Sequence, residues 1–188
     1  MTICDKKLII GLAGEIASGK GTITNFIVKN YNGKNFRFST ILRDIINRLY
    51  LEETRENLQK LSTLLRDNFG QDVLSSAIAK EAKNSKDKIL AIDGVRRLSD
   101  IKFLKDFPGF KLIYVEADVE KRFQRISARG ENTDDNTKTF EQFKKELEQE
   151  SEIQIKGLRN NADYIINNNG SIEELHNQVD KIIKQLCG

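Results

Sequence analysis

The chain has 188 residues, of which 38% are hydrophobic and 31% charged, and its formal net charge is +3. This balance is typical of one soluble globular domain, and it lacks the concentrated basic stripe of a nucleic-acid-binding protein. No stretch has the length of a membrane span or the pattern of a signal peptide, so we expect a cytoplasmic protein without a nucleic-acid or membrane partner.

The two cysteines lie near opposite ends of the sequence, at Cys4 and Cys187. Their separation matches neither the short spacing of a metal-ligand pair nor that of a redox motif. We therefore expect both to be reduced thiols, as is usual in a cytosolic protein.

Five short apolar runs predict buried parallel strands. Continuous apolar character in such runs is expected when both faces of a sheet are covered. They span residues 8–13, 35–38, 88–93, 111–117 and 163–167.

Helical patterns separate these runs. Apolar residues recur with helical spacing in two segments, at Leu58, Leu61, Leu65 and Phe69, and at Ile172, Leu175, Val179, Ile182 and Leu186. Alternating strands and helices predict an α/β fold, with a five-stranded parallel sheet between two layers of helices.

A glycine-rich segment, GEIASGKGT, follows the first predicted strand. Gly14, Gly19 and Lys20 fit the pattern G-x-x-x-x-G-K of a phosphate-binding loop, whereas Gly21 stands where a serine or threonine is usual. The spacing of the glycines does not fit the dinucleotide pattern G-x-G-x-x-G. Such a loop turns its amides and the start of the next helix toward phosphates. The predicted ATP-binding residues are Gly14, Glu15, Ile16, Ala17, Ser18, Gly19, Lys20, Gly21 and Thr22.

The ending Gly-Lys-Gly-Thr resembles the adenylate-kinase and cytidylate-kinase branch of the P-loop nucleoside monophosphate kinases. The resemblance implies a P-loop NTPase fold, ATP as co-substrate, and Mg²⁺ held mainly by water and nucleotide. A hydroxyl at Gly21 is then unnecessary, Thr22 would contact phosphate, and Lys20 would be catalytic. We expect a single kinase domain over residues 1–188, with an acceptor-binding helical region at about 39–85 and a short lid at about 125–138.

The segment FSTILRD, residues 38–44, follows the second predicted strand. It is similar to the stretch of adenylate kinases in which a helix carries an arginine onto the acceptor phosphate. The match implies that Ser39 and Arg43 bind the acceptor, although Ile41 replaces the Gly-Asp pair of that family. The alternative is an Arg43 that simply faces solvent from its helix.

The segment AIDGVRR, residues 91–97, places Asp93 at the carboxyl end of an apolar strand, where ligands bind in such folds. Asp93 would orient Mg²⁺ through water and border the acceptor. The segment resembles the Asp-Gly-Phe-Pro-Arg motif of adenylate kinases, so that Arg97 takes the arginine position. Other P-loop kinases favour Arg96, and both remain candidates for binding the acceptor phosphate, with Arg96 also a catalytic candidate. The plain alternative is a glycine turn with solvated arginines.

Three arginines, Arg122, Arg125 and Arg129, share one helical face beside an apolar stripe. We expect them at the rim of the core, before a short lid, where Arg125 and Arg129 would stabilise charge on the transferred phosphoryl group. The alternative is an ordinary charged surface.

The segment ADYIINNNGSIEEL, residues 162–175, resembles the last strand and following helix of dephospho-coenzyme A kinases and related nucleotide kinases. The resemblance implies that the intervening loop approaches the adenine of ATP through Asn168, Asn169 and Gly170. The alternative is a turn that binds no ligand.

These motifs predict an ATP-dependent kinase that phosphorylates a nucleoside or deoxynucleoside monophosphate. Such an acceptor is already an anion and needs no general base. The nearest alternative is a dephospho-coenzyme A kinase, whose hydroxyl acceptor benefits from a carboxylate base; that family has an Asp-rich segment where this chain has FSTILRD. A third alternative is a non-catalytic nucleotide-binding protein or regulatory ATPase.

Overall fold

The computed structural model describes residues 4–129, 139–148 and 150–188. Its centre is a five-stranded parallel sheet with the strand order β2-β3-β1-β4-β5. The strands are β1 (Leu8–Ala13), β2 (Lys34–Arg37), β3 (Ile89–Val95), β4 (Phe110–Glu116) and β5 (Tyr164–Asn167). Each lies within two residues of a predicted apolar run, which confirms the predicted fold class.

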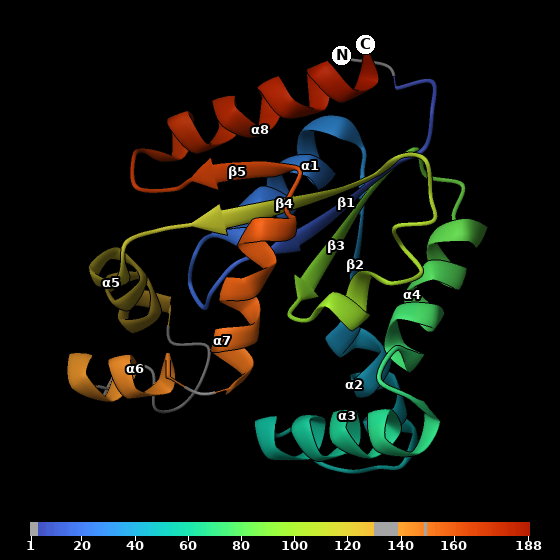
Figure 1. Ribbon diagram of the computed structural model, residues 1–188, viewed down its shortest axis with the longest axis vertical. Helices are drawn as coiled ribbons and strands as arrows, with labels where there is room; N and C mark the ends of the chain where they lie inside the picture. Colours follow the sequence, from blue (N-terminus) through green and yellow to red (C-terminus); the bar gives the residue numbers. More distant parts are fainter. Residues whose placement is uncertain (1–3, 130–138, 149) are drawn as a thin grey trace.

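Helices connect the strands and cover both faces of the sheet (Figure 1). The α-helices are α1 (Lys20–Tyr31), α2 (Phe38–Arg48), α3 (Arg55–Phe69), α4 (Val73–Asn84), α5 (Val119–Arg129), α6 (Phe140–Glu146), α7 (Glu150–Gly157) and α8 (Ile172–Cys187). Two short 3₁₀ helices are η1 (Leu98–Ile101) and η2 (Leu158–Asn161).

Strand β1 shows how the layers are built. Leu8, Ile10 and Leu12 pack in one core with apolar residues of α1 and α8. Ile9 and Ala13 point the opposite way and pack in a second core with residues of α2, α4 and α7. All five side chains are at most 1% exposed, so β1 is buried on both faces, as its continuous apolar sequence predicts.

Two element boundaries differ from the prediction. Phe38, expected at the end of a strand, is the first residue of α2. Strand β3 continues past Asp93 to Val95 through Gly94, whose φ of +88° is one that side chains rarely adopt. The register of β1 against β3 shifts at this point, because Leu12 pairs with Asp93 and Ala13 with Val95.

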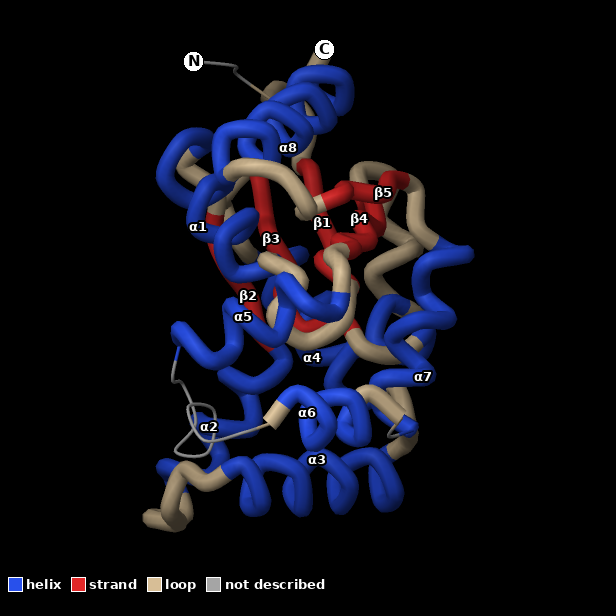
Figure 2. The backbone as a smooth tube through the Cα atoms, turned by 90° about the vertical axis from the view of Figure 1, so that its left-hand side faces the viewer, coloured by secondary structure: helices blue, strands red, loops and turns tan. Residues whose placement is uncertain are grey.

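The two ends of the described chain meet. Helix α8 runs back to the edge where β1 begins, and Cys4 and Cys187 form a disulfide with their Cα atoms 4.8 Å apart. The expectation of two reduced thiols is therefore wrong, because the packing of α8 pairs residues that the sequence separates by 183 positions. In both views α3 and α6 lie at the end of the molecule opposite the termini (Figures 1 and 2).

We find no helix in the described parts of the chain that combines the length and the apolar character needed to cross a membrane.

Candidate active site

The glycine-rich loop lies between β1 and α1 and depends on glycine at two points. Gly14 has φ +144° and Gly19 has φ +106°. A Cβ atom on Gly14 would lie 2.3 Å from the carbonyl oxygen of Val115, and one on Gly19 would lie 2.1 Å from Nδ2 of Asn168. The backbone can curl this tightly only because both positions lack a side chain.

Lys20 begins α1 and folds back into the loop. Its Nζ donates to the carbonyl oxygens of Gly14 at 2.6 Å and Glu15 at 2.9 Å, and to Oγ of Ser18 at 3.5 Å. The ammonium group thus lies within the curl of the backbone, at the N-terminal end of a 12-residue helix. Both the cation and the helix terminus favour an anion there.

Arg122 holds the loop from the side of α5. Its guanidinium donates to Oε1 of Glu15 at 3.2 Å and to the carbonyl oxygens of Ile16 at 3.4 Å and Ala117 at 3.1 Å. The side chain is only 4% exposed, so the expectation that Arg122 lies at the rim of the core is wrong. It is a buried support of the loop, because its partners come from the loop and from the end of β4.

An apolar cluster covers this support. Ile16 and Ala17 of the loop pack with residues of α5 and α6, among them Ile126 and Phe143. Arg122 also lies over the ring of Phe143, 5.8 Å from its centroid. The two helices therefore hold the tip of the loop through apolar contacts.

Burial and charge near the loop change the acidity of Tyr114. This β4 residue is 3% exposed. Burial, followed by the charge of Glu15, raises the pKa of Tyr114 to about 12. The phenol is therefore neutral at physiological pH.

Asn168 holds the loop from the other side. Its Nδ2 donates to the carbonyl oxygen of Ser18 at 2.7 Å, and the side chain is buried. Its backbone N–H donates to Glu116, and its carbonyl oxygen accepts from Nη2 of Arg125 at 2.8 Å. The structure therefore brings Asn168 to the loop and Arg125 to Asn168. The Asn168 side chain braces the loop backbone, which the sequence did not reveal.

The next residues of the same turn face α5 and α8. Asn169 exchanges hydrogen bonds with Asp118 at 2.8 and 2.9 Å. A Cβ atom on Gly170 would lie 1.7 Å from Oε2 of Glu174, the carboxylate that caps α8. These contacts explain structurally why asparagine and glycine occupy positions 169 and 170 of the turn.

Most of the predicted lid lies outside the residues that the structure describes. Arg129 is the last residue of α5, and its side chain lies outside the described residues. Residues 130–138, the greater part of the predicted lid, also lie outside them.

The carboxyl ends of β2 and β3 bring Arg37 and Asp93 together. These residues are paired in the sheet register, and Nε of Arg37 lies 3.1 Å from Oδ2 of Asp93. Asp93 is 15% exposed and Arg37 is 43% exposed. The sequence analysis did not identify Arg37 as a site residue. The available signal was a cationic residue at the end of the strand that precedes the strand carrying Asp93.

Ser39 and Arg43 lie on the first turns of α2. Arg43 donates to Oγ of Ser39 at 2.9 Å and pairs with Glu53 at 3.1 Å. The structure thus brings the two predicted acceptor residues together, and Arg43 is oriented by its partners rather than simply solvated.

Arg96 and Arg97 take different positions after β3. Arg96 is exposed, whereas Arg97 is half-buried. Arg97 lines a cavity of about 660 Å³ between α3, η1 and α7, with Thr63, Arg66, Ser99 and Gln154 among the other lining residues. The two candidates that the sequence could not separate therefore differ in their access to a cavity.

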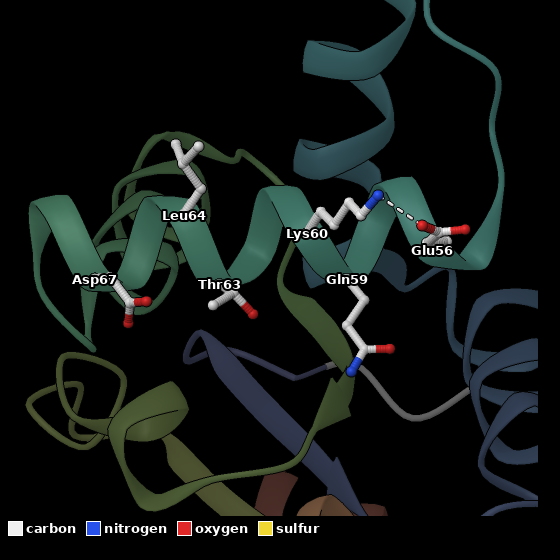
Figure 3. Close-up of a pocket in the computed structure, with 6 residues that line it drawn as sticks. All are labelled: Glu56, Gln59, Lys60, Thr63, Leu64 and Asp67. Atoms are coloured by element: carbon white, nitrogen blue, oxygen red, sulfur yellow. Dashed lines mark ion pairs between the residues drawn. The ribbon is translucent and has the colours of Figure 1, made fainter.

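A second cavity of about 500 Å³ lies along α3. In Figure 3, Gln59, Thr63 and Asp67 lie on one side of the helix and Leu64 on the other. Lys60 pairs with Glu56 at 2.6 Å at this cavity. Thr63 and Asp67 line both cavities, and we call the two cavities together the α3 cleft.

Asp93 is the candidate ligand for a magnesium ion that would be shared with a nucleotide. Among residues 4–129, 139–148 and 150–188, no three His, Cys, Asp or Glu side chains are grouped as ligands of a metal. Mg²⁺ commonly takes one or two carboxylates and completes its shell with water and phosphate oxygens. Asp93 is a carboxylate suited to that arrangement.

A parallel five-stranded sheet with a G-x-x-x-x-G-K loop between β1 and α1 defines the P-loop kinase-like fold. The structure is similar to a gluconokinase from Sinorhizobium meliloti, with a TM-score of 0.61, 10% identity, and coverage of 98% of this chain and 95% of that one. It is also similar to a shikimate kinase from Bacteroides thetaiotaomicron, with a TM-score of 0.60, 14% identity, and coverage of 94% and 98%. At these identities the likeness shows the fold.

The family follows from the sequence. The family model described as an AAA domain matches residues 13–144, and the chain belongs to that family. It is also 30% identical over 187 residues to the UPF0200 protein TK1334 of Thermococcus kodakarensis, a match that covers 95% of this chain and 98% of the relative. The chain and the UPF0200 proteins thus share one P-loop family.

Proposed function

We propose that the protein is an ATP-dependent kinase that transfers the γ-phosphoryl group to a nucleoside or deoxynucleoside monophosphate. The fold and family support a P-loop phosphotransferase. The observation that carries the choice of acceptor is the ion pair at the carboxyl ends of β2 and β3. There Arg37 pairs with Asp93 at 3.1 Å, where a kinase with a hydroxyl acceptor would benefit from an unpaired base.

The donor half of the site consists of the loop and its supports. ATP phosphates would occupy the curl between Gly14 and Thr22, and Lys20 would turn from the loop carbonyls toward the β- and γ-phosphates. Within the described chain, Nη1 of Arg125 is buried and lacks a hydrogen-bond partner. A phosphate oxygen would satisfy that donor, which supports a catalytic role for Arg125; we extend the same role to Arg129 by its place on α5.

The acceptor half lies toward the α3 cleft, between about residues 39–85 and η1. Arg97 would bind the acceptor phosphate, because it lines the cavity that the exposed Arg96 does not line. Arg43 with Ser39, and Arg37 while it stays paired with Asp93, would surround the same anion. Guanidinium groups bind phosphate with paired hydrogen bonds.

The reaction requires positioning and charge stabilisation rather than acid–base chemistry. An oxygen of the acceptor phosphate would attack the γ-phosphorus in line, and the bond from that phosphorus to the oxygen bridging it to the β-phosphate would break, releasing ADP. Mg²⁺ would be held by Asp93 through water and would neutralise phosphate charge. Lys20 and Arg125 would stabilise the equatorial oxygens.

Dephospho-coenzyme A is the second candidate acceptor. The observation in its favour is that Asp93 is a carboxylate, 15% exposed, at the carboxyl edge of the sheet. Released from Arg37, it would accept a proton from a ribose hydroxyl.

The test is ADP release from ATP and Mg²⁺, measured with each ribo- and deoxynucleoside monophosphate and with dephospho-coenzyme A. We expect turnover with at least one monophosphate, and its loss in Lys20→Ala. Lys29→Ala, an exposed lysine in the last turn of the same helix, is the matched control and should keep full activity. Turnover with dephospho-coenzyme A alone would select the second candidate, and no ADP release with any acceptor would refute a kinase of this class.

A further inference from the structure

A buried ion pair joins α3 to the turn that carries Arg97. Nη2 of Arg66 on α3 lies 2.7 Å from Oδ1 of Asp100 on η1. The two side chains are only 6% and 2% exposed. Removing both charges from water is costly, and an apolar pair of similar size is often as stable. A buried pair at this place therefore calls for an explanation besides stability.

The second oxygen of Asp100 holds the backbone after β3. Oδ2 accepts from the N–H groups of Arg96 at 2.9 Å and Arg97 at 3.1 Å. Arg66 is fixed in turn, because its Nη1 donates to the carbonyl oxygen of Gln71 at 2.5 Å. The Arg66–Asp100 pair thus connects α3, the turn after α3, and the backbone from which the Arg97 side chain departs.

We propose that Asp100 and Arg66 are positioning residues, which set Arg97 for the phosphate of the acceptor. The inference rests on the proposed function and deepens it, because it makes acceptor binding depend on where α3 lies. Arg66 and Arg97 line the same cavity. The amide of Arg97 is held by Asp100, so the origin of its side chain is fixed relative to the cavity wall that α3 provides.

A positioning role has a kinetic signature that a purely structural role lacks. Asp100→Asn removes the charge that Arg66 needs while it keeps the size of the side chain. We expect it to raise KM for the acceptor about tenfold and to leave KM for ATP within about twofold, because the loop that binds ATP has separate supports. Arg66→Lys, which keeps the charge but lacks the planar fork, should give the same pattern to a smaller extent.

Asp163→Asn is the matched control. Asp163 likewise bridges a cation and a backbone amide, with Lys111 Nζ at 2.9 Å and the N–H of Leu112 at 2.8 Å. It lies where β4 and β5 begin, at the edge of the sheet opposite Arg97. We expect this variant to leave both KM values unchanged.

A double-mutant cycle tests whether Asp100 acts through Arg97. If it does, Asp100→Asn should have little further effect on acceptor KM in an Arg97→Ala protein, and its full effect in an Arg96→Ala protein. Equal effects in both backgrounds would overturn the assignment. So would a parallel rise of both KM values in Asp100→Asn, which would indicate a general loss of structure.

Hydrogen exchange gives a readout that needs no turnover. The amides of Arg96 and Arg97 should exchange at least tenfold faster in Asp100→Asn than in the wild-type protein, and at the wild-type rate in Asp163→Asn. Unchanged exchange at these amides would overturn the positioning role. A wild-type protein that turns over no acceptor would instead refute the proposed function, so the two failures are distinct.

Discussion

Two glycines of the phosphate-binding loop should respond to alanine in opposite ways. At Gly19 a side chain meets a left-handed backbone, φ +106°, and its Cβ atom would lie 2.1 Å from Nδ2 of Asn168. At Gly21, two residues further along and inside α1, a Cβ atom would meet nothing within 4 Å. Comparing the two alanine variants therefore distinguishes a position whose backbone conformation requires glycine from a position that merely accepts it.

The expected magnitudes follow from these contacts. The left-handed backbone costs about 1–2 kcal/mol in alanine. The clash displaces the Asn168 side chain and leaves the buried carbonyl of Ser18 without its partner, which costs about 1–3 kcal/mol more. Gly19→Ala should therefore lower the free energy of unfolding by about 2–5 kcal/mol. Gly21→Ala should raise it by up to about 1 kcal/mol, because alanine favours the helix.

Urea denaturation of both variants tests the expected changes in the free energy of unfolding, and calorimetry measures their ATP binding. Gly19→Ala should also weaken ATP binding, since the amides that would face the phosphates shift with the backbone, whereas Gly21→Ala should keep the wild-type course of the loop backbone. If the two variants unfold at the same urea concentration, the close approach of Asn168 to Gly19 does not support the loop, and our account of the loop is wrong.

Three further predictions concern stability. Dithiothreitol or Cys4→Ser should lower the free energy of unfolding by up to about 5 kcal/mol, the chain-entropy value for a loop closed across 183 positions, and an unchanged melting temperature under reductant would contradict the disulfide. Because burial raises the pKa of Tyr114 from 10.0 to about 12, the neutral phenol contributes up to about 3 kcal/mol, which is fully present below pH 10 and is lost as pH rises toward 12. Urea denaturation at pH 9 and pH 11 should show about half of this loss in the wild-type protein and a smaller loss in Tyr114→Phe; equal losses would refute the cause. Arg122→Met should cost about 3 kcal/mol because it leaves the Glu15 carboxylate, 16% exposed, without its main partner, and thermal denaturation should show partial rescue by adding Glu15→Gln.

The parts of the fold that the sequence predicted are those with local signals. Strands β1, β3 and β4 are largely buried apolar runs, and the loop is a short pattern of fixed spacing. Both features could be predicted because few distant residues are needed to form them. Phe38 shows the limit of such signals, because an apolar residue at an element boundary fits the end of a strand and the start of a helix equally well.

The parts that the sequence did not reveal depend on residues far apart in the chain. Asn168 reaches the carbonyl of Ser18 across 150 positions, and Arg122 reaches Glu15 across 107. A turn rich in asparagine and a helix with regularly spaced arginines are common patterns that specify no partner. Only the order of strands in the sheet, which sets β1 beside β4, brings these side chains to the loop.

The disulfide between Cys4 and Cys187 has a consequence for the chain as a covalent object. It makes the polypeptide between the two cysteines a macrocycle, so a protease that cuts one exposed connection produces an opened ring and not two molecules. Such a nicked protein should migrate as one band in a non-reducing gel and fall into fragments only when thiol is added.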